Sequence, residues 1–225
     1  TEVGAATALT NLRTGNNAFT GALPTEVGQL TSLVFLDLSL NEVTGALPTE
    51  LGLLGENLFQ LELPSSTLLN STLPTELGNL SALQFLDASD SGAGLYGSIP
   101  TEVGAMAALS QLSLGRNELT GALPSEIGLM AALSLLRLAD NALSGPLPTS
   151  IGLLGASLQF VEAQANSLSS RLPTEMGRLT RVTYWDLNSN TGLTGAVPTE
   201  VGAMAALTRL DLRFISGLCE VGSNA

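Results

Sequence analysis

Residues 25–48 read TEVGQLTSLVFLDLSLNEVTGALP, and this stretch decides the fold because its pattern returns along the whole chain. Copies begin at residues 1, 25, 49, 75, 101, 125, 149, 174 and 199, so the spacing stays between 24 and 26 residues. A fixed period of this length is typical of stacked units, each too small to bury its own apolar face. The sequence therefore predicts a solenoid.

The centre of the quoted unit, residues 35–39, alternates in the period-two manner of a short strand with one buried face. Asn41 follows the strand, Gly45 marks a turn, and Pro48 precedes the next copy. These residues resemble the plant-type leucine-rich repeat, and the resemblance covers essentially the whole chain. It implies an α/β solenoid: a right-handed superhelix of about nine repeats, with a parallel concave sheet and short helical or 3₁₀ turns on the convex side.

All nine copies fit one leucine-rich-repeat domain, residues 1–225, whose last repeat is expected to be a degenerate C-terminal cap. Cys219, the only cysteine, lies where that repeat loses its pattern. Plant-type members usually close their ends with paired cysteines, so the resemblance implies a partner outside this chain. A free, largely buried thiol is the alternative. The third and fourth units carry extra residues, which predict longer loops around 65–72 and 89–97, side by side.

Three residue types return at fixed places in the repeat, and we interpret them as structural. Glycine stands at the fourth position of all nine units, which indicates either a positive φ or tight packing against the next coil. Asparagine recurs at the Asn41 position in six units, where a buried amide can bond the backbone of a turn. By resemblance, these form an asparagine ladder. Proline precedes each helical turn and sets its φ.

Composition excludes several kinds of partner. The 225 residues carry a net charge of −12, with eight arginines and no lysine or histidine, so nucleic acid and anionic membrane surfaces are poor partners. The apolar runs are too short to span a membrane. The chain opens within a repeat and lacks a secretory leader, as expected for a mature or trimmed fragment. The sequence leaves the oligomeric state open.

Catalysis is not expected. Without histidine or lysine, and with one cysteine near the end, the chain lacks the residues of nucleophile–base triads, zinc sites and Schiff bases. Carboxylates on neighbouring strands lie about 4.8 Å apart, near the spacing of retaining glycosidases. That spacing follows from any ladder of acids, and nothing in the sequence shapes a cleft around one. We therefore predict no catalytic residue, metal or cofactor.

Two columns of outward strand positions form the candidate ligand surface. Aromatic rings facing solvent on a concave sheet are unfavourable unless covered, and interfaces are enriched in them. Carboxylates on adjacent strands repel one another, which favours a divalent cation or a basic partner. The alternative is that exposed strand positions tolerate almost any residue. The candidate contacts are Phe35, Asp37, Glu62, Phe85, Asp87, Phe160, Glu162, Tyr184, Asp186 and Asp211. Trp185 takes the inward leucine position and is expected in the core.

Two columns of hydroxyl residues offer a second surface. The first lies four residues before each proline: Thr20, Thr44, Thr120, Ser144, Ser169 and Thr194. The second opens the repeat: Thr1, Thr25, Thr49, Thr75, Thr101, Thr149, Thr174 and Thr199. Regular hydroxyl ladders resemble the faces of repeat-type ice-binding proteins, which makes binding to an ice, mineral or polysaccharide lattice the alternative function. The simpler interpretation is helix capping by these hydroxyls.

Two tripeptides match the N-glycosylation pattern, at Asn70 and Asn79, and fit a secreted or cell-surface chain. Taken together, these features predict a non-catalytic extracellular recognition module that binds a protein, peptide or glycan on its concave sheet. A receptor ectodomain fragment, a secreted adhesion protein and an inhibitor of cell-wall hydrolases all agree with the resemblance.

Overall fold

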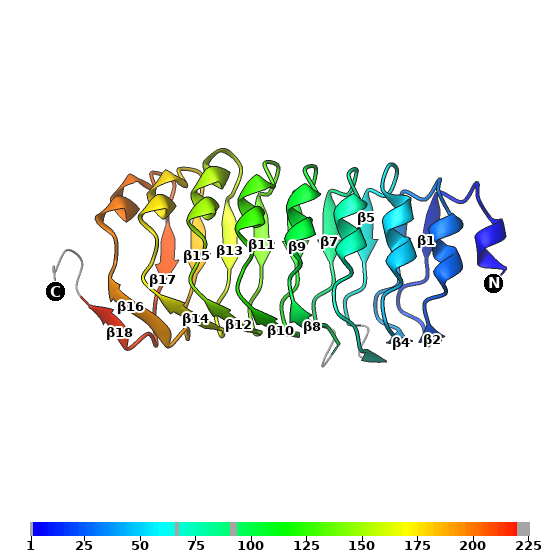
Figure 1. Ribbon diagram of the computed structural model, residues 1–225, viewed down its shortest axis with the longest axis horizontal. Helices are drawn as coiled ribbons and strands as arrows, with labels where there is room; N and C mark the ends of the chain where they lie inside the picture. Colours follow the sequence, from blue (N-terminus) through cyan, green and yellow to red (C-terminus); the bar gives the residue numbers. More distant parts are fainter. Residues whose placement is uncertain (1, 66–67, 91–93, 220–225) are drawn as a thin grey trace.

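The computed structural model describes residues 2–65, 68–90 and 94–219. The described coils stack into an elongated array with its two ends far apart (Figure 1). Nine strands form one parallel sheet in the order β1-β3-β5-β7-β9-β11-β13-β15-β17, so consecutive coils are always neighbours. Their bounds are β1 Asn11–Arg13, β3 Phe35–Asp37, β5 Gln60–Glu62, β7 Phe85–Asp87, β9 Gln111–Ser113, β11 Leu135–Arg137, β13 Phe160–Glu162, β15 Tyr184–Asp186 and β17 Arg209–Asp211.

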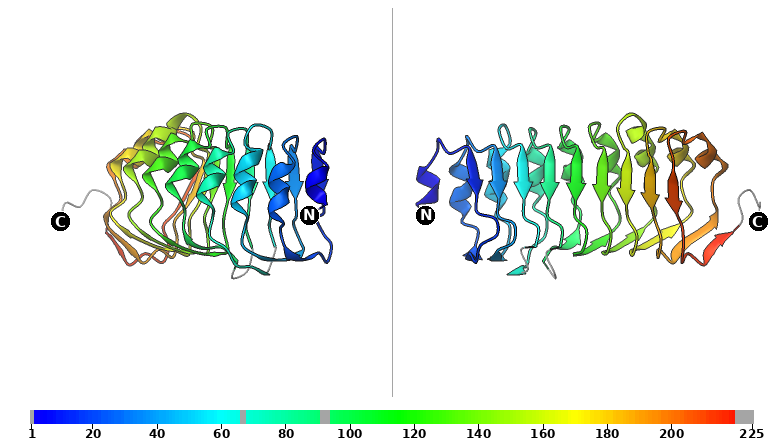
Figure 2. Two further views of the ribbon diagram at one scale, coloured as in Figure 1. Left: turned by 45° about the vertical axis from the view of Figure 1, so that its right-hand side comes forward. Right: turned by 180° about the vertical axis from the view of Figure 1, so that it is seen from behind.

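Short 3₁₀ helices cover the convex side, opposite this sheet (Figure 2). In the described residues they are η1 Val3–Ala5, η2 Thr25–Gln29, η3 Thr49–Leu54, η4 Thr75–Asn79, η5 Thr101–Ala105, η6 Ser125–Leu129, η7 Thr149–Ala156, η8 Thr174–Arg178 and η9 Thr199–Ala203. Each contacts the helix of the next coil. This arrangement confirms the predicted leucine-rich-repeat solenoid with a concave parallel sheet.

A second set of strands closes each coil between the concave strand and the next helix (Figure 1). Their bounds are β2 Thr20–Ala22, β4 Glu42–Gly45, β6 Leu68–Leu69, β8 Tyr96–Ser98, β10 Glu118–Gly121, β12 Ala142–Gly145, β14 Ser167–Ser170, β16 Gly192–Ala196 and β18 Gly217–Cys219. They form a three-stranded and a six-stranded sheet, which separate between β6 and β8. Within the described residues, one isolated bridge, Ser71 to Leu95, joins the two parts. The described ends of the two lengthened loops therefore lie side by side, whereas residues 66–67 and 91–93 of these loops lie outside the described residues.

Apolar residues from every coil fill the interior. The central residue of each concave strand points inward, and Leu36, Leu86, Val161 and Trp185 are all at most 3% exposed. On the convex side, Leu30 and Leu33 at the end of the helical turn are also fully buried. The core is one continuous column because each coil buries its apolar face against the next. The prediction that Trp185 is a core residue is confirmed.

The glycine column is explained by packing between coils, and the alternative of a positive φ is wrong. A Cβ on Gly104 would lie 2.6 Å from the backbone oxygen of Glu126 in the next coil. Left-handed backbone occurs instead one residue before the asparagine position, with φ between 52° and 60°. The residues there are Asn16, Leu40, Ser65, Asp90, Arg116, Asp140, Ala165, Ser189 and Phe214. Glycine is thus required where backbones meet.

The asparagine ladder is present, and Asn190 shows its bonding. This fully buried amide donates to the carbonyls of Ala163 at 2.9 Å and Leu187 at 2.8 Å, while its Oδ1 accepts from the backbone N–H of Leu168 at 3.0 Å. Because three backbone groups from two coils converge on one side chain, the turn needs no strand partner there. In the ninth coil this place is taken by Ile215, which is buried.

Three finer expectations need correction. Proline occupies the N-cap of η2 to η9, and no side chain makes a cap hydrogen bond in the described helices; the hydroxyl of Thr25 donates to Glu26 instead. One extra residue of the third unit lies in its helical turn, because Leu54 and Leu58 fill the places of Leu30 and Leu33. Cys219 is exposed and forms no disulfide with a described residue, so the buried-thiol alternative is wrong; a partner outside this chain stays a prediction. The single-domain division with a C-terminal cap stays a prediction.

Among the described residues, no helix combines the length and apolar character needed to cross a membrane.

Candidate functional site

The candidate contact residues lie on one face of the concave sheet. Strand pairing aligns Phe35 with Gln60 and Phe85, and Phe160 with Tyr184. The carboxylates align in the same way, as Asp37, Glu62 and Asp87 on β3, β5 and β7, and as Glu162, Asp186 and Asp211 on β13, β15 and β17. Their inward neighbours are buried, so both predicted columns face away from the core.

The structure divides the rings into two clusters. In the first, Phe59 lies between Phe35 and Phe85, at ring-centre distances of 5.8 and 5.2 Å, and the guanidinium of Arg13 lies 4.9 Å from the ring centre of Phe35. Sequence reasoning missed Phe59 because it precedes strand β5 and belongs to neither outward column. An aromatic residue at the Val34 position of the repeat was the available signal.

The second cluster is a layered stack on β11 to β17. The rings of Phe160 and Tyr184 are 4.5 Å apart and nearly parallel, at 8°. Arginine guanidiniums lie on either side, Arg137 at 5.6 Å from the Phe160 ring centre and Arg209 at 5.3 Å from that of Tyr184. The stack joins four adjacent strands and holds both rings in fixed orientations. The two rings were predicted from the sequence as contact residues, and the two arginines were not.

The candidate rings are half-buried, which differs from the expectation that they face solvent freely. They cover one another across the strands, because adjacent strands lie about 4.8 Å apart, within reach of ring stacking. The clusters therefore contribute to stability and also present partly open ring surfaces. A ligand would meet two preformed apolar surfaces rather than a row of separate side chains.

Arginines pair with much of the C-terminal run of acids. Arg137 Nε lies 3.1 Å from Glu162, and Arg209 and Arg213 reach the buried Asp211 at 3.0 and 2.7 Å. Hydrogen bonds from Arg213, and then from Arg209, hold the pKa of the Asp211 carboxyl well below its usual range, against the opposing effect of burial. These contacts leave little uncompensated negative charge at this end of the sheet.

Asp186 lies between these ion pairs and bonds to neutral groups. Its Oδ1 accepts from the backbone N–H and the amide of Asn188, at 2.9 and 2.7 Å, and its Oδ2 accepts from the hydroxyl of Tyr184 at 3.1 Å. Burial, and then the hydrogen bond to Asp186, raise the pKa of the Tyr184 hydroxyl. Tyr184 is thus held by its ring in the stack and by its hydroxyl on a buried carboxylate.

The N-terminal run of acids lacks such counter-charges. Asp37 and Asp87 each accept from the serine two residues later, with hydroxyl distances of 2.6 Å, and Glu62 accepts from the amide of Gln60. No ion pair forms with these three carboxylates within the described residues. A hollow of about 250 Å³ opens beside them, lined by Arg13, Phe35, Leu36, Asp37, Gln60 and Glu62.

No group of three His, Cys, Asp or Glu side chains in the described part of the chain is arranged to hold a metal ion. The three aligned acids do not converge on one point, because each side chain is held by a donor on its own strand. The geometry therefore gives no support to the divalent-cation alternative, and a basic partner is the remaining one.

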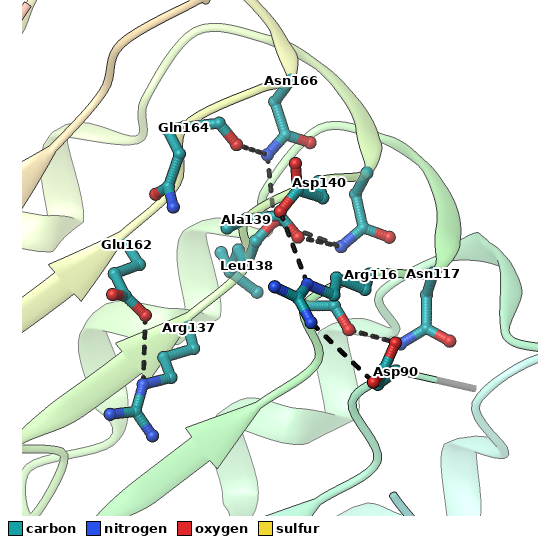
Figure 3. A network of polar contacts seen from close by, with 12 residues as sticks. Asp90, Arg116, Asn117, Arg137, Leu138, Ala139, Asp140, Glu162, Gln164 and Asn166 are labelled. Atoms are coloured by element: carbon teal, nitrogen blue, oxygen red, sulfur yellow. Dashed lines mark hydrogen bonds and ion pairs between the residues drawn. The ribbon is translucent and has the colours of Figure 1, made fainter. Parts of the chain in front are cut away.

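A polar network runs along the edge where the concave strands end (Figure 3). Arg116 lies between Asp90 and Asp140, at 3.8 and 3.9 Å, and all three are well exposed. Beside it, a groove of about 330 Å³ is bordered by Arg137 and by Gln164, whose Oε1 is buried and without a hydrogen-bond partner in the described residues. Exposed pairs at such distances contribute little to stability.

The hydroxyl columns do not form one aligned face. Strand pairing in the second sheet sets Thr120 opposite Ala142 and Thr194 opposite Gly217, so each strand is offset by two residues from its neighbour. Equivalent hydroxyls on successive coils are therefore displaced along the strands by roughly 6–7 Å. In the column that opens the repeat, six threonines bond instead to the adjacent glutamate: Thr25, Thr49, Thr75, Thr101, Thr174 and Thr199. Lattice binding stays a prediction that this geometry does not favour.

Both candidate glycosylation sites are exposed. Asn70 lies in the loop that follows β6, and Asn79 ends the helix η4 on the convex side. Neither asparagine is part of the concave sheet, so glycans at these positions would leave the ring clusters open. Glycosylation at these two residues stays a prediction.

The chain is similar to solved structures of plant receptors. It is 31% identical to the leucine-rich-repeat (LRR) ectodomain of the plant membrane receptor kinase GASSHO1/SCHENGEN3 from Arabidopsis thaliana, in complex with CASPARIAN STRIP INTEGRITY FACTOR 2; the match covers 97% of this chain and 31% of that chain, with a TM-score of 0.77. A TDR receptor is 30% identical over 97% of this chain and 36% of that chain, with a TM-score of 0.86.

The plant peptide hormone receptor RGFR1, in complex with RGF2, is also 30% identical, over 97% of this chain and 37% of that chain, with a TM-score of 0.74. The chain thus spans about a third of the length of these three receptor chains. No protein-family model matches the chain, and no curated protein matches it.

Proposed function

We propose that the concave sheet of this plant-type leucine-rich-repeat protein binds an extracellular protein or peptide ligand and catalyses no reaction on it. The observation that carries the proposal is the pair of preformed ring clusters, Phe35–Phe59–Phe85 and Phe160–Tyr184, on the concave sheet. Aromatic side chains held in fixed orientations are the residues most enriched among interface hot spots.

The solved relatives support the class of ligand. RGFR1 is a peptide hormone receptor in complex with RGF2, and the receptor kinase HAESA, 25% identical to this chain, is in complex with the peptide hormone IDA and the co-receptor SERK1. An extended peptide suits the concave face, because the two ring clusters lie on the same sheet, separated by strands β9 and β11. A glycan ligand is the alternative that the experiment below distinguishes.

An extracellular location belongs to the same proposal. Two of the similar structures are ectodomains of plant receptor kinases. The exposed sequons at Asn70 and Asn79 lie off the concave face, where glycans would not block a ligand.

The test compares two pairs of substitutions. Purified wild-type chain, a Phe85→Ala/Phe160→Ala variant and a Leu129→Ala/Leu153→Ala variant serve as baits in the native extracellular fraction, and captured molecules are identified by mass spectrometry. Leu129 and Leu153 are each 61% exposed on convex helices, so they match the concave pair as large apolar side chains. We expect the concave variant to lose capture at least about tenfold and the convex variant to retain it.

Circular dichroism and thermal melting establish that each bait is folded. Full capture by a folded concave variant would contradict the proposal, and loss with the convex variant alone would move the site to the helices. Glycan-only capture would assign the concave face to carbohydrate recognition.

A further inference from the structure

A ring and a carboxylate two residues apart recur on the concave strands. The pairs are Phe35 with Asp37 on β3, Phe85 with Asp87 on β7, Phe160 with Glu162 on β13, and Tyr184 with Asp186 on β15. Side chains two residues apart on a strand project from the same face, so each pair presents an aromatic surface beside a negative charge.

On β13, an arginine of the chain itself contacts both the ring and the carboxylate of the pair. The guanidinium of Arg137 lies 5.6 Å from the ring centre of Phe160 and 3.1 Å from Glu162. Arg137 comes from the preceding strand, β11, where strand pairing sets it directly opposite Glu162. One guanidinium thus stacks on the ring and bonds to the carboxylate at the same time. Its planar shape permits both contacts.

The pair on β7 has the same two residue types without the arginine. Strand pairing sets Asp87 opposite Glu62 on β5 and Ser113 on β9, so the place that corresponds to Arg137 holds a second carboxylate. No arginine of the described residues forms an ion pair with Asp87 or Glu62. A cation-binding arrangement that is complete on β13 therefore lacks its cation on β7.

An open hollow borders one of these two carboxylates, Glu62. The hollow of about 250 Å³ reaches Gln60 and Glu62, on the strand next to Phe85 and Asp87. The amide of Gln60 holds Glu62, and the hydroxyl of Ser89 holds Oδ1 of Asp87 at 2.6 Å. Each carboxylate is thus oriented through one of its oxygens, and no described side chain donates a hydrogen bond to its other oxygen. Phe59 and Phe85, 5.2 Å apart, form an aromatic wall.

We propose that Glu62, Phe85 and Asp87 form a subsite for one arginine side chain of a basic peptide ligand, whose guanidinium stacks on Phe85 and bonds the two carboxylates. The subsite rests on the proposed function, since it assigns the chemistry of one ligand residue to one place on the concave face. A guanidinium is favoured over an ammonium because it stacks flat on a ring while its N–H groups reach two carboxylates.

The test uses N-acetyl-L-argininamide as the probe and N-acetyl-L-citrullinamide, its neutral isostere, as the matched control. Each is titrated into the isotope-labelled full chain, and chemical-shift changes are followed by NMR. We expect saturable binding of the arginine probe, with shifts at β5 and β7, and no saturable binding of the citrulline analogue. Binding should weaken with added salt, because both contacts are electrostatic.

Three variants locate the subsite. Asp87→Asn should weaken binding of the arginine probe about fivefold to tenfold, since both the ion pair and the ring contact are partly exposed. Glu62→Arg places an arginine where Arg137 stands relative to Phe160, so the chain should fill its own subsite and lose the probe. Glu118→Gln, on the second sheet, changes the net charge as Asp87→Asn does and should leave binding unchanged.

Equal binding of the citrulline analogue, or undiminished binding by a folded Glu62→Arg variant, would overturn the subsite. The capture experiment on the proposed function is independent of this result. Loss of capture by the Phe85→Ala/Phe160→Ala variant, combined with no binding of the arginine probe, would leave the concave face as the ligand surface and remove only the arginine assignment.

Discussion

At some positions of this repeat the neighbouring coil tolerates several residue types, and at others it tolerates only one. The glycine column shows the strictest demand, because the fourth residue of the second to eighth coils lies against the backbone of the next coil. A Cβ at Gly28, Gly52 or Gly78 would lie 2.5 Å from a glutamate carbonyl oxygen. No real Cβ approaches an oxygen that closely, so a larger residue must push the coils apart along the whole turn.

Gly104→Val should therefore destabilise the chain by about 2–4 kcal/mol. Gly202 provides the matched control, because a Cβ there meets no atom of the described residues within 4 Å. Gly202→Val should change the stability by less than about 0.5 kcal/mol. Chemical denaturation followed by circular dichroism measures both values. Equal midpoints for the two variants would show that coil contact does not select the glycine.

The repeat pattern was sufficient to predict the inward leucines, the asparagine ladder and the strand register, because each depends on spacing within one coil. It was insufficient to choose between a positive φ and close packing for Gly104, since both exclude a side chain. It also did not show that Phe59 joins two outward rings, or that Arg209 lies over Tyr184. Those contacts depend on how the side chains of neighbouring coils are oriented toward one another. The spacing of residues within one coil does not determine that orientation.

Strands differ in charge along the concave sheet although their backbones are equivalent. The acids of β3, β5 and β7 bond only to neutral donors within the described residues, whereas β17 places Asp211 between Arg209 and Arg213. The sheet is therefore negative toward its N-terminal coils and nearly balanced toward its C-terminal coils. An elongated ligand with a basic end would be oriented by this difference, which acts on the association rate and on register more than on affinity.

The ion pairs of β17 should make the last coil sensitive to acid. The folded-state pKa of Asp211 lies below its unfolded value, so its stabilising contribution is fully present above the unfolded pKa of about 3.9. The contribution is lost as the pH falls from there toward the folded pKa. We expect the difference in melting temperature between wild type and Asp211→Asn to be large at pH 6 and to shrink steadily below about pH 4.

Thermal melts at a series of pH values measure this difference. Glu118→Gln, an exposed acid outside the ion pairs, serves as the control and should melt like the wild type throughout. A difference between wild type and Asp211→Asn that stays constant down to pH 2 would contradict the role of the ionised carboxylate.

The array as a whole depends on contacts between neighbouring coils only. Helices contact the next helix, concave strands the next strand, and the second-sheet strands the next of their kind. Stability is then close to a sum of coil terms and nearest-neighbour terms. One interruption stands out, the separation of the second sheet between β6 and β8, where the bridge from Ser71 to Leu95 is the one strand-type link within the described part of the chain.

Deletion of residues 125–148 should leave a shorter array that still folds. The deletion removes one coil of the repeat and joins Pro124 to Thr149, so that the helical turn after Pro124 begins as before. Gly104 then meets Ser150 in place of Glu126. We expect native-like circular dichroism, cooperative unfolding and a lower midpoint, because one coil and one interface are lost.

A control deletion of residues 137–148 removes the second half of the same coil, so that the chain passes from strand β11 directly into the helical turn at Thr149. It should unfold with much lower cooperativity, because the remaining half coil lacks β12 and cannot complete its contacts with the neighbouring coils. Equal behaviour of the two deletions would contradict the nearest-neighbour description.

The exposed thiol of Cys219 has a practical consequence. The chain contains one cysteine and no lysine, so a maleimide reagent can react with one side chain only. That side chain lies in β18, which pairs with β16 at the end of the second sheet and takes no part in the concave sheet. Molecules tethered to a sensor chip through this atom would all be attached at the same point, which lies outside the concave sheet and leaves the ring clusters uncovered.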